Sequence, residues 1–344
     1  MNGRGEAPGL AGHRRPGGGA MDGFPTPRAP EPYLVAINLT RRCNLRCRHC
    51  YLDAGSRREG QDQELTTAEL IALFEEIAGR ARETLVVLSG GEPLLREDIH
   101  VLISTGNTAG LRMVLGTNGL LMDTEVAARL KQAGLEGVGI SLDSLSPLEH
   151  DGFRGVPGAW RRAVTAIEAC RAVELHVQLH TTLTRQNVAQ IPSFVGLAQY
   201  LDVAMVNFFF LICTGRGQSL SDLTPQEYES ALQAIARVQA KMAFPMIQAR
   251  CAPHFKRILY QMDPASPFTR AQGYDGGGCL AATRYCRVDP TGNVTPCPYL
   301  KSVAGNLRRA SFWTIWDQSP LLAELRRPTR GGRCGRCEFA ALCG

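Results

Sequence analysis

Three cysteines, Cys43, Cys47 and Cys50, lie within eight positions in the stretch "CNLRCRHC". A disulfide uses two thiols, and a structural zinc site normally uses four ligands. Three thiolates at this spacing let a loop wrap one face of an iron–sulfur cubane, with each thiolate on its own iron. The fourth iron would be open to bind a substrate or cofactor, as in catalytic metal sites. The alternatives are a zinc site completed by His49 and three unrelated buried thiols.

The rest of the composition also favours metal binding. The chain has 344 residues, 12 cysteines and 44% apolar residues. It has no apolar run of membrane-spanning length and no apolar signal region at the N-terminus, so we expect a cytoplasmic protein without a membrane span. Thiols stay reduced in that compartment, which argues against a disulfide framework. The net charge of +6 is mild and the arginines are scattered, so nucleic-acid binding gets little support.

Strand-like and helix-like segments alternate from Tyr33 onward, which predicts an α/β fold with parallel strands and crossover helices. The expected strands cover residues 33–40, 84–90, 111–119, 137–143, 176–183 and 204–213. Six such units suggest a partial barrel or an open doubly wound sheet. In either architecture the functional groups lie at the carboxyl ends of the strands, where the three cysteines follow the first strand. Helix starts are predicted at the capping box of Thr66 with Glu69 and at Thr224, Pro225 and Glu227.

The chain divides by composition into four segments. Residues 1–32 are rich in Gly, Pro and Arg, which predicts a disordered tail, and Met21 could be the true start. Residues 33–215 would form the core partial barrel and residues 216–274 a helical linker. The Gly- and Cys-rich residues 275–344 are too irregular for an α/β unit and predict a small domain stabilised by metal.

The cysteine stretch resembles the signature of the radical S-adenosylmethionine (SAM) superfamily. The resemblance implies a partial six-unit (β/α) barrel with a [4Fe-4S] cluster. In that family the amino and carboxylate groups of SAM bind the fourth iron, and an electron from the cluster cleaves SAM to a 5′-deoxyadenosyl radical. The resemblance leaves the residues that act on the substrate unknown.

Further motifs extend the resemblance to the SAM contacts. "SGGEPLL" is similar to the family's glycine-rich motif, whose backbone must approach the ligand closely. It implies that Gly90, Gly91, Glu92 and Pro93 hold the methionine amino group. The residues that flank the adenine would be His49 and Tyr51. The strand ends "TNG" and "SLD" would direct Asn118, Ser141 and Asp143 toward the ribose and carboxylate of SAM, and Arg154 would pair with that carboxylate.

The C-terminal cysteines resemble the SPASM extension of the same superfamily, which holds auxiliary iron–sulfur clusters. The resemblance implies one or two such clusters, the first on Cys279, Cys286 and Cys297 and the second on Cys334, Cys337 and Cys343. A zinc ribbon is the alternative. The family pattern continues with further cysteines beyond the position of Cys343, whereas this chain stops at Gly344, so we expect a truncated domain with incomplete ligand sets.

Three other cysteines, Cys170, Cys213 and Cys251, are expected in the core. His180 would face a barrel interior, as a substrate contact or a core histidine. "FRGVPGAW" and "TGRG" are among the stretches closest to the branch of alternative haem and denitrifier-haem biosynthesis. That branch implies a tetrapyrrole substrate whose propionate is decarboxylated or removed, and a reductant such as flavodoxin or ferredoxin. The alternatives are a maturase of a ribosomally synthesised peptide and a non-catalytic iron–sulfur or zinc protein.

Overall fold

A computed structural model describes residues 29–55, 63–220, 223–271 and 278–343. Within these residues ten strands form one sheet in the order β10-β9-β8-β1-β2-β3-β4-β5-β6-β7. Neighbours from β8 through β1 to β7 are parallel, and β9 and β10 are added antiparallel. The strands are β1 (Leu34–Asn38), β2 (Leu85–Ser89), β3 (Arg112–Thr117), β4 (Gly137–Ser141), β5 (His176–Leu183), β6 (Met205–Phe210), β7 (Met246–Arg250), β8 (Tyr285–Val288), β9 (Asn293–Thr295) and β10 (Gly305–Asn306).

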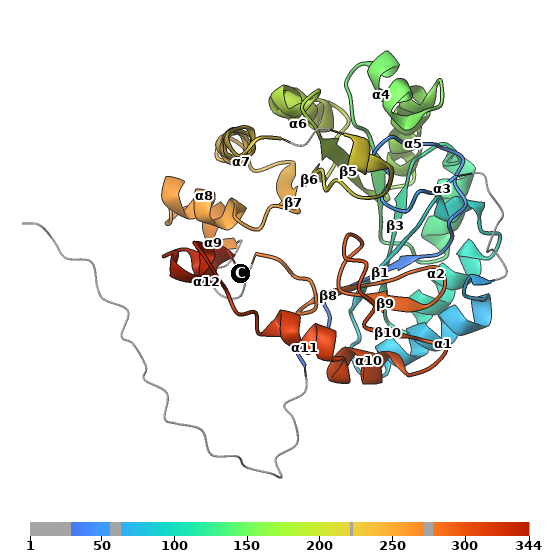
Figure 1. The fold of residues 1–344 in the computed structure, drawn as a ribbon. Helices are drawn as coiled ribbons and strands as arrows, with labels where there is room; N and C mark the ends of the chain where they lie inside the picture. The colour runs from blue at the N-terminus through green and yellow to red at the C-terminus, as the bar shows by residue number, and fades with distance from the viewer. Residues whose placement is uncertain (1–28, 56–62, 221–222, 272–277, 344) are drawn as a thin grey trace, which may run out of the picture.

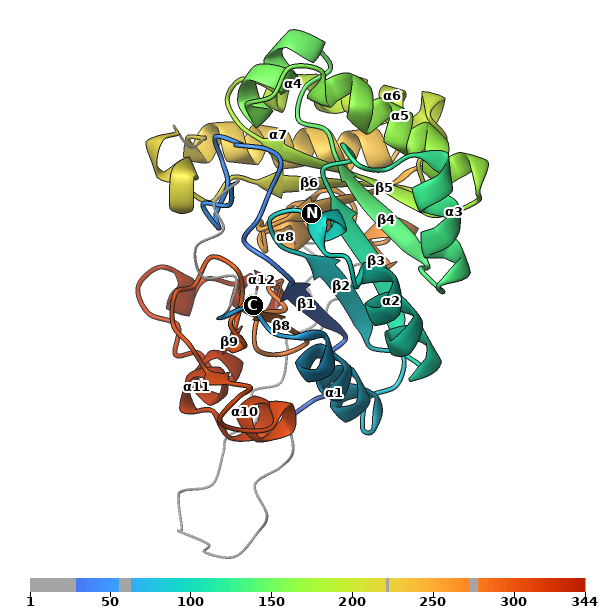
Figure 2. The same ribbon diagram turned by 90° about the vertical axis from the view of Figure 1, so that its right-hand side faces the viewer.

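Helices follow the strands and cover the outside of the curved sheet (Figures 1 and 2). They are α1 (Thr67–Ala78), α2 (Ile99–Thr108), α3 (Thr124–Gln132), α4 (Pro147–Arg154), α5 (Ala159–Ala172), α6 (Ile191–Tyr200), α7 (Pro225–Gln239), α8 (Phe255–Met262), α9 (Pro267–Ala271), α10 (Phe312–Gln318), α11 (Pro320–Arg326) and α12 (Ala340–Cys343). The capping box predicted at the start of α1 is present, and the helix start predicted at Thr224 begins α7, also with a capping box. The predicted α/β partial barrel is confirmed.

Burial alternates along the barrel strands and defines two faces. On β1, Val35 and Ile37 are fully buried and belong to the main apolar core, whereas Ala36 between them is only partly buried. The same alternation continues on β2 and β3. Because successive side chains on a strand point to opposite faces, one face packs on the helices and the other lines the concave side of the sheet. We call the space along this concave face the lumen.

Two parts of the chain differ from the sequence-based expectation. The segment expected to be a helical linker, 216–274, contains β7, which pairs with β6 and extends the sheet. The C-terminal region is also not separate from the barrel, because β8 pairs with β1 along Leu34–Ile37. The two ends of the barrel sheet therefore gain strands that sequence periodicity did not reveal. The exact domain boundaries stay predictions.

The last four residues of the predicted N-terminal tail belong to the folded chain. Residues 1–28 lie outside the described residues, but residues 29–32 pack against the folded chain. The Trp316 indole donates a hydrogen bond to the carbonyl of Pro30 at 3.0 Å, and the Thr84 hydroxyl donates to that of Pro32 at 3.2 Å. The disorder expected for the whole of 1–32 is therefore wrong for its last four residues.

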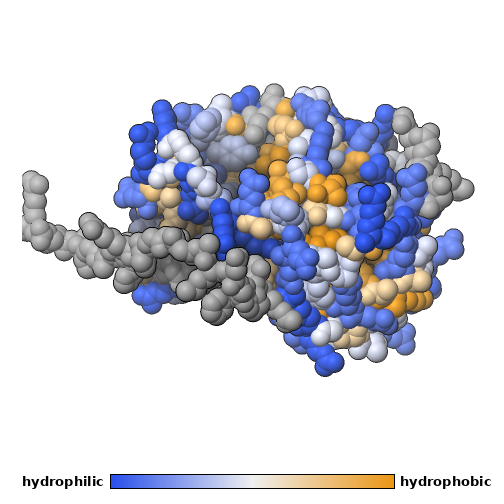
Figure 3. Space-filling model, turned by 60° about the horizontal axis from the view of Figure 1, so that its bottom comes forward, coloured by the Kyte–Doolittle hydropathy of each residue, from blue (hydrophilic) through white to orange (hydrophobic). Residues whose placement is uncertain are grey.

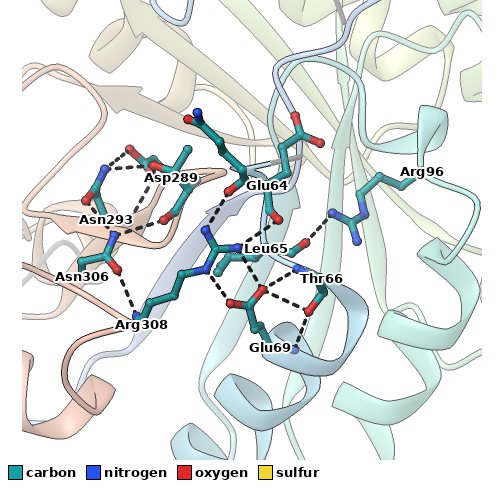
Figure 4. Close-up of polar contacts among 11 residues, drawn as sticks. Glu64, Leu65, Thr66, Glu69, Arg96, Asp289, Asn293, Asn306 and Arg308 are labelled. Atoms are coloured by element: carbon teal, nitrogen blue, oxygen red, sulfur yellow. Dashed lines mark hydrogen bonds and ion pairs between the residues drawn. The ribbon is translucent and has the colours of Figure 1, made fainter. Parts of the chain in front are cut away.

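Polar contacts attach the C-terminal strands to the start of α1 (Figure 4). Arg308 binds both carboxylate oxygens of Glu69 at 2.6 and 3.1 Å and donates to the carbonyls of Gln63 and Glu64. On the other side, the Asn306 side-chain oxygen accepts from the Arg308 backbone, and its amide donates to Asn293. Glu69 is also the N3 residue of the α1 capping box, whose N-cap is Thr66. The C-terminal region is thus anchored on the first crossover helix, beside the strand that precedes the cysteine loop.

On the side of the molecule shown in Figure 3, apolar side chains form separate patches among hydrophilic ones. No helix in the described residues is long and apolar enough to cross a membrane.

Candidate functional site: the cysteine loop and the barrel lumen

The loop that follows β1 carries Cys43, Cys47 and Cys50. Cys43 and Cys47 are buried and Cys50 is partly buried, and all three belong to a small apolar cluster of their own. Backbone N–H groups of the same loop donate to two of the sulfurs, from Leu45 to Cys43 and from Ala54 to Cys50, each at 3.4 Å. Donors aimed at sulfur stabilise bound thiolates and tune a cluster. Burial raises the pKa of the Cys43 thiol to about 12, and deprotonation would accompany metal binding.

The loop is held in place by backbone contacts to distant elements. The backbone N–H groups of Arg46 and Arg48 donate to the carbonyls of Arg154 and Phe153 at the end of α4, at 3.1 and 2.9 Å. From the segment after β6, Arg216 donates to the Cys47 carbonyl at 2.9 Å and the Ala54 carbonyl at 2.7 Å. Arg216 is a positioning residue that the sequence did not single out; it lies in "TGRG", which was noted only for its resemblance.

Two glycines allow the strand ends to approach this loop. A Cβ on Gly91 would lie 2.0 Å from the Arg42 carbonyl oxygen, and one on Gly90 would lie 2.7 Å from that of Thr40. Gly90 also has φ +137°, a value that side chains rarely tolerate. The two glycines thus let the cysteine loop pack against the end of β2, and their predicted approach to SAM stays a prediction.

Glu92 joins the ends of β2 and β3 from a fully buried position. Its carboxylate accepts hydrogen bonds from the Thr117 hydroxyl at 2.7 Å, the Asn118 backbone at 2.9 Å and the Leu94 backbone at 3.2 Å. Burial raises the pKa of this carboxyl to about 7. The Asn118 side chain in turn donates to Asn44 at 2.7 Å and points its amide at the Cys43 sulfur, 3.9 Å away.

Arg154 and Asp143 form a buried ion pair at 2.5 Å beside the loop. Arg154 also donates to the Cys47 sulfur at 3.7 Å, and Asp143 accepts from the Thr182 backbone at 2.7 Å. Although burial opposes it, the Arg154 guanidinium lowers the pKa of the Asp143 carboxyl. Asp143 and Arg154, two of the residues predicted to contact SAM, are thus brought together. The Arg154 guanidinium, however, already pairs with the Asp143 carboxylate.

The other predicted SAM residues lie among different neighbours. His49 stacks on Phe153 with centroids 4.6 Å apart, and burial lowers its pKa to about 4. The Tyr51 hydroxyl accepts a hydrogen bond from Asn38 on β1 at 3.0 Å. Ser141 ends β4 and Pro93 starts a short turn after β2. Their roles in SAM binding stay predictions.

The lumen is polar and cationic next to this loop. The Asn207 amide donates to Gln178 on β5 at 2.9 Å, and its oxygen accepts from Arg250 on β7 at 2.8 Å. On β8, Arg287 donates to Asn38 and lies 5.9 Å from the centre of the Tyr51 ring. In the described part of the chain, no carboxylate forms an ion pair with either arginine.

His180 occupies the same face, as expected. Its ring packs edge-on against Phe209 at 5.2 Å, and a Cβ on Gly139 would lie 2.2 Å from it, so a side chain at that position on β4 would have to displace the ring. Burial, together with the charges of Arg250 and Arg154, lowers the His180 pKa to about 4. The imidazole is therefore neutral near pH 7. Sequence reasoning found His180 by strand periodicity but missed both lumen arginines, which lie on the strands it did not predict.

The C-terminal cysteines are not arranged as expected. Cys286 is fully buried in the main apolar core, on the face of β8 opposite to Arg287, so the prediction that it joins Cys279 and Cys297 is corrected. Cys251, expected in the core, is exposed. Cys334, Cys337 and Cys343 lie close enough to interact electrostatically, with burial and then Cys337 raising the pKa of Cys343.

The surroundings of Cys43, Cys47 and Cys50 suit an iron–sulfur cluster and not a single metal ion. Among the described residues, no three His, Cys, Asp or Glu side chains converge closely enough to hold a single metal ion. The fit therefore rests on the surroundings of the thiols. Buried sulfurs, backbone N–H donors to sulfur and an arginine beside Cys47 suit an anionic iron–sulfur cluster.

Comparison with known proteins agrees with this geometry. Residues 37–198 match the model of the radical SAM superfamily, and residues 279–338 match an iron–sulfur cluster-binding domain named SPASM. The chain belongs to the radical SAM superfamily and is a radical SAM enzyme. Its cofactors are a [4Fe-4S] cluster and SAM, and the second match adds auxiliary iron–sulfur binding.

Named relatives cover nearly the whole chain. An AdoMet-dependent heme synthase of Methanosarcina barkeri is 36% identical over 91% of this chain and 90% of its own length. A pre-heme d1 synthase of Dinoroseobacter shibae is 31% identical over 92% of this chain and 81% of its own. The crystal structure of Streptococcus suis SuiB bound to S-adenosylmethionine shares the fold, with a TM-score of 0.71 at 16% identity over 91% of this chain and 72% of that one.

Proposed function

We propose that this enzyme acts on a tetrapyrrole in haem biosynthesis and decarboxylates or removes a propionate side chain. The observation that carries the proposal is the pair of lumen arginines, Arg250 and Arg287, which have no carboxylate partner among the described residues. A guanidinium binds a carboxylate through two parallel hydrogen bonds, so two of them suit a substrate with several propionates. The similarity to heme synthases over most of the chain supports the same substrate class.

The aromatic rings beside the lumen arginines support a flat substrate. Tyr51 lies next to Arg287, and the Tyr299 ring contacts it edge-on at 5.6 Å. An aromatic ring such as that of Tyr299 packs well against a macrocycle, whereas Tyr51 is proposed to contact SAM. His180 is neutral at working pH, so it can donate or accept a hydrogen bond without adding charge to the lumen.

The predicted site residues divide between the cluster and SAM. Cys43, Cys47 and Cys50 would hold the cluster, and Gly90, Gly91, Glu92 and Pro93 would hold the methionine end of SAM. The contacts to the rest of SAM would come from His49, Tyr51, Asn118, Ser141, Asp143 and Arg154. When bound, the cluster and SAM would supply a 5′-deoxyadenosyl radical that takes a hydrogen atom from the propionate, and the electron released on decarboxylation would need an acceptor such as an auxiliary iron–sulfur cluster. The protein's part is to orient that side chain with Arg250 and Arg287 and to keep water from it. We propose flavodoxin or ferredoxin as the reductant.

The test is conversion of tetrapyrroles by the anaerobically reconstituted enzyme with dithionite and SAM. Mass spectrometry of iron-coproporphyrin III and related propionate-bearing macrocycles should show loss of carbon dioxide together with two hydrogens, or of a whole side chain, with one 5′-deoxyadenosine per event. Conversion of a short precursor peptide and of no tetrapyrrole would contradict the proposal and favour the peptide-maturase alternative.

Variants of Arg250 and Arg287 test whether these two arginines bind the substrate. Arg250→Ala and Arg287→Ala should each weaken tetrapyrrole binding about 10- to 100-fold, the range for losing a hydrogen bond to a charged group. SAM cleavage without substrate should stay unchanged. Arg129→Ala, on the exposed surface of α3, is the matched control and should change neither. Full tetrapyrrole affinity in both lumen variants would remove these arginines from the substrate site.

A further inference from the structure

Cys251 lies at an unusual place in the fold. It directly follows the last residue of β7, at one end of the ten-stranded sheet, and it is exposed. Its φ of 61° lies in the left-handed region, which is uncommon for a residue with a side chain. Such backbone conformations persist where surrounding structure or function demands them. The turn at Cys251 is not explained by packing of the thiol in a core.

A tyrosine connects Cys251 to the strands at the other end of the sheet. The Tyr299 hydroxyl and the Cys251 thiol share a hydrogen bond. Tyr299 lies two residues after Cys297, and the backbone N–H groups of Tyr299 and Leu300 donate to the Cys297 sulfur. The pattern is the one seen at Cys43, whose sulfur accepts from the backbone two residues later. Cys297 thus sits in a backbone nest like that of a proposed cluster ligand, with Cys251 beside it.

The third thiol of this group is Cys279. Its neighbour Gly278 passes directly against the turn after Cys251, because a Cβ on Gly278 would lie 2.4 Å from the Pro253 carbonyl oxygen. The Gly278 backbone also donates to the Cys343 carbonyl at 2.8 Å. The Cys279 and Cys297 thiols both lie near enough to Cys251 to interact with it electrostatically. The three thiols therefore lie in one neighbourhood, although they come from three separated segments.

We propose that Cys251, Cys279 and Cys297 are ligands of one auxiliary iron–sulfur cluster, and that this cluster joins the edge strand β7 to the C-terminal strands across the opening of the barrel. Cys286 is excluded, because it lies on the opposite face of β8 within the apolar core. Cys251 lies 28 residues before the first residue of the SPASM match, so that match does not assign it a role. The cluster would replace, at the opening, the strand pairing that closes a complete barrel.

Iron analysis of the full-length chain tests the proposal. In a Cys43→Ala/Cys47→Ala/Cys50→Ala background, which leaves only auxiliary iron, Cys251→Ala should lose the iron and acid-labile sulfide of one cluster. Cys297→Ala should lose the same amount, and the double variant should lose no more than either single one, because the residues act on one site. Cys286→Ala and Cys170→Ala are matched controls that remove a buried thiol and should retain all auxiliary iron.

A second measurement separates ligation from folding. Thermal unfolding of the iron-loaded proteins should show a lower melting temperature for Cys251→Ala than for the parent, whereas the two should melt alike after complete removal of iron. Full iron, full sulfide and an unchanged electron paramagnetic resonance spectrum in Cys251→Ala would overturn the proposal. It would also be overturned by equal destabilisation with and without iron, or by loss of the same cluster in Cys286→Ala.

Discussion

The cysteine loop after β1 and the C-terminal cysteine region both supply thiols, but the protein surrounds them differently. Cys43 and Cys47 are each 8% exposed and are enclosed by the barrel helices and strand ends. Cys334 and Cys337 are exposed and lie on a short turn before α12. A radical that must not meet water requires the first arrangement. The second suits ligands whose bound metal supplies much of the local order.

The largest expected effect distinguishes the two regions directly. Replacing Cys43, Cys47 and Cys50 by Ala should abolish production of 5′-deoxyadenosine with dithionite, because no thiolates remain to hold the cluster that binds SAM. The C-terminal iron and sulfide should remain. Chromatography of the nucleoside product and metal analysis measure the two outcomes, with Cys170→Ala as a control that retains both.

Two results would break this comparison. If the triple variant still produced 5′-deoxyadenosine, the cysteine loop would not be the SAM site. If it retained zinc without sulfide, the C-terminal region would be a zinc domain.

The next largest effect concerns the ion pair that supports the cysteine loop. Arg154→Ala leaves Asp143 as a buried unpaired charge, so the free energy of unfolding should fall by roughly 3–5 kcal/mol. SAM binding should also weaken, by roughly 1.5–3 kcal/mol, for loss of a charged hydrogen bond. Denaturant unfolding and equilibrium dialysis measure the two quantities separately.

A second substitution serves as the control for stability. Asp143→Asn added to Arg154→Ala removes the unpaired charge and should recover part of the unfolding free energy without restoring SAM affinity. Wild-type SAM affinity in Arg154→Ala would remove this residue from the SAM site.

The third prediction concerns how the free energy of unfolding depends on pH through the buried carboxyl of Glu92. Burial raises the folded-state pKa of Glu92 from 4.5 to about 7. The protonated carboxyl therefore favours the folded state at low pH, and this contribution is lost as the pH rises from about 4.5 to about 7. Since one pKa unit corresponds to about 1.4 kcal/mol, the full change is roughly 3 kcal/mol.

Glu92→Gln, which does not titrate, should remove this dependence. The difference in unfolding free energy between wild type and variant should fall across that pH range. His49, His150 and His180 have pKa values lowered to about 4, so their contribution is lost as the pH falls below about 6.5. That effect is common to both proteins and cancels. A difference that does not change with pH would show that Glu92 is already ionised at pH 5.

Much of the barrel followed from the sequence because strand and helix periodicities are local. The thiol spacing also pointed to a cluster, and the two glycines after β2 pointed to a close backbone approach. Residues brought in by tertiary structure could not be found in this way. Arg216 binds the Cys47 carbonyl across 169 positions of sequence, and no local pattern predicts such a contact.

Strand register explains the error at Cys286. A change of one residue in register moves a side chain to the other face of a sheet. The pairing of β8 with β1 places Cys286 opposite Val35, on the apolar face, and Arg287 opposite Ala36, on the lumen face. Because β8 was not predicted as part of the barrel sheet, spacing alone could not distinguish the ligand from the core thiol.

The smallest expected effect tests whether the cysteine loop owes its order to contacts that the C-terminal thiols lack. Arg216→Ala removes hydrogen bonds to the Cys47 and Ala54 carbonyls and an ion pair with Asp53 at 2.7 Å. The carbonyl contacts remain mostly shielded from water, whereas Asp53 is largely exposed and should contribute little. We expect iron at the cysteine loop to be lost to a chelator several-fold faster, while auxiliary iron is lost at the wild-type rate.

Arg216→Lys keeps the charge but not the planar fork, so its rate of iron loss should lie between those of the wild type and Arg216→Ala. Stopped-flow absorbance with SAM added, which should protect only the iron of the cysteine loop, assigns each phase. Faster loss from the auxiliary phase alone would reverse the comparison between the two regions.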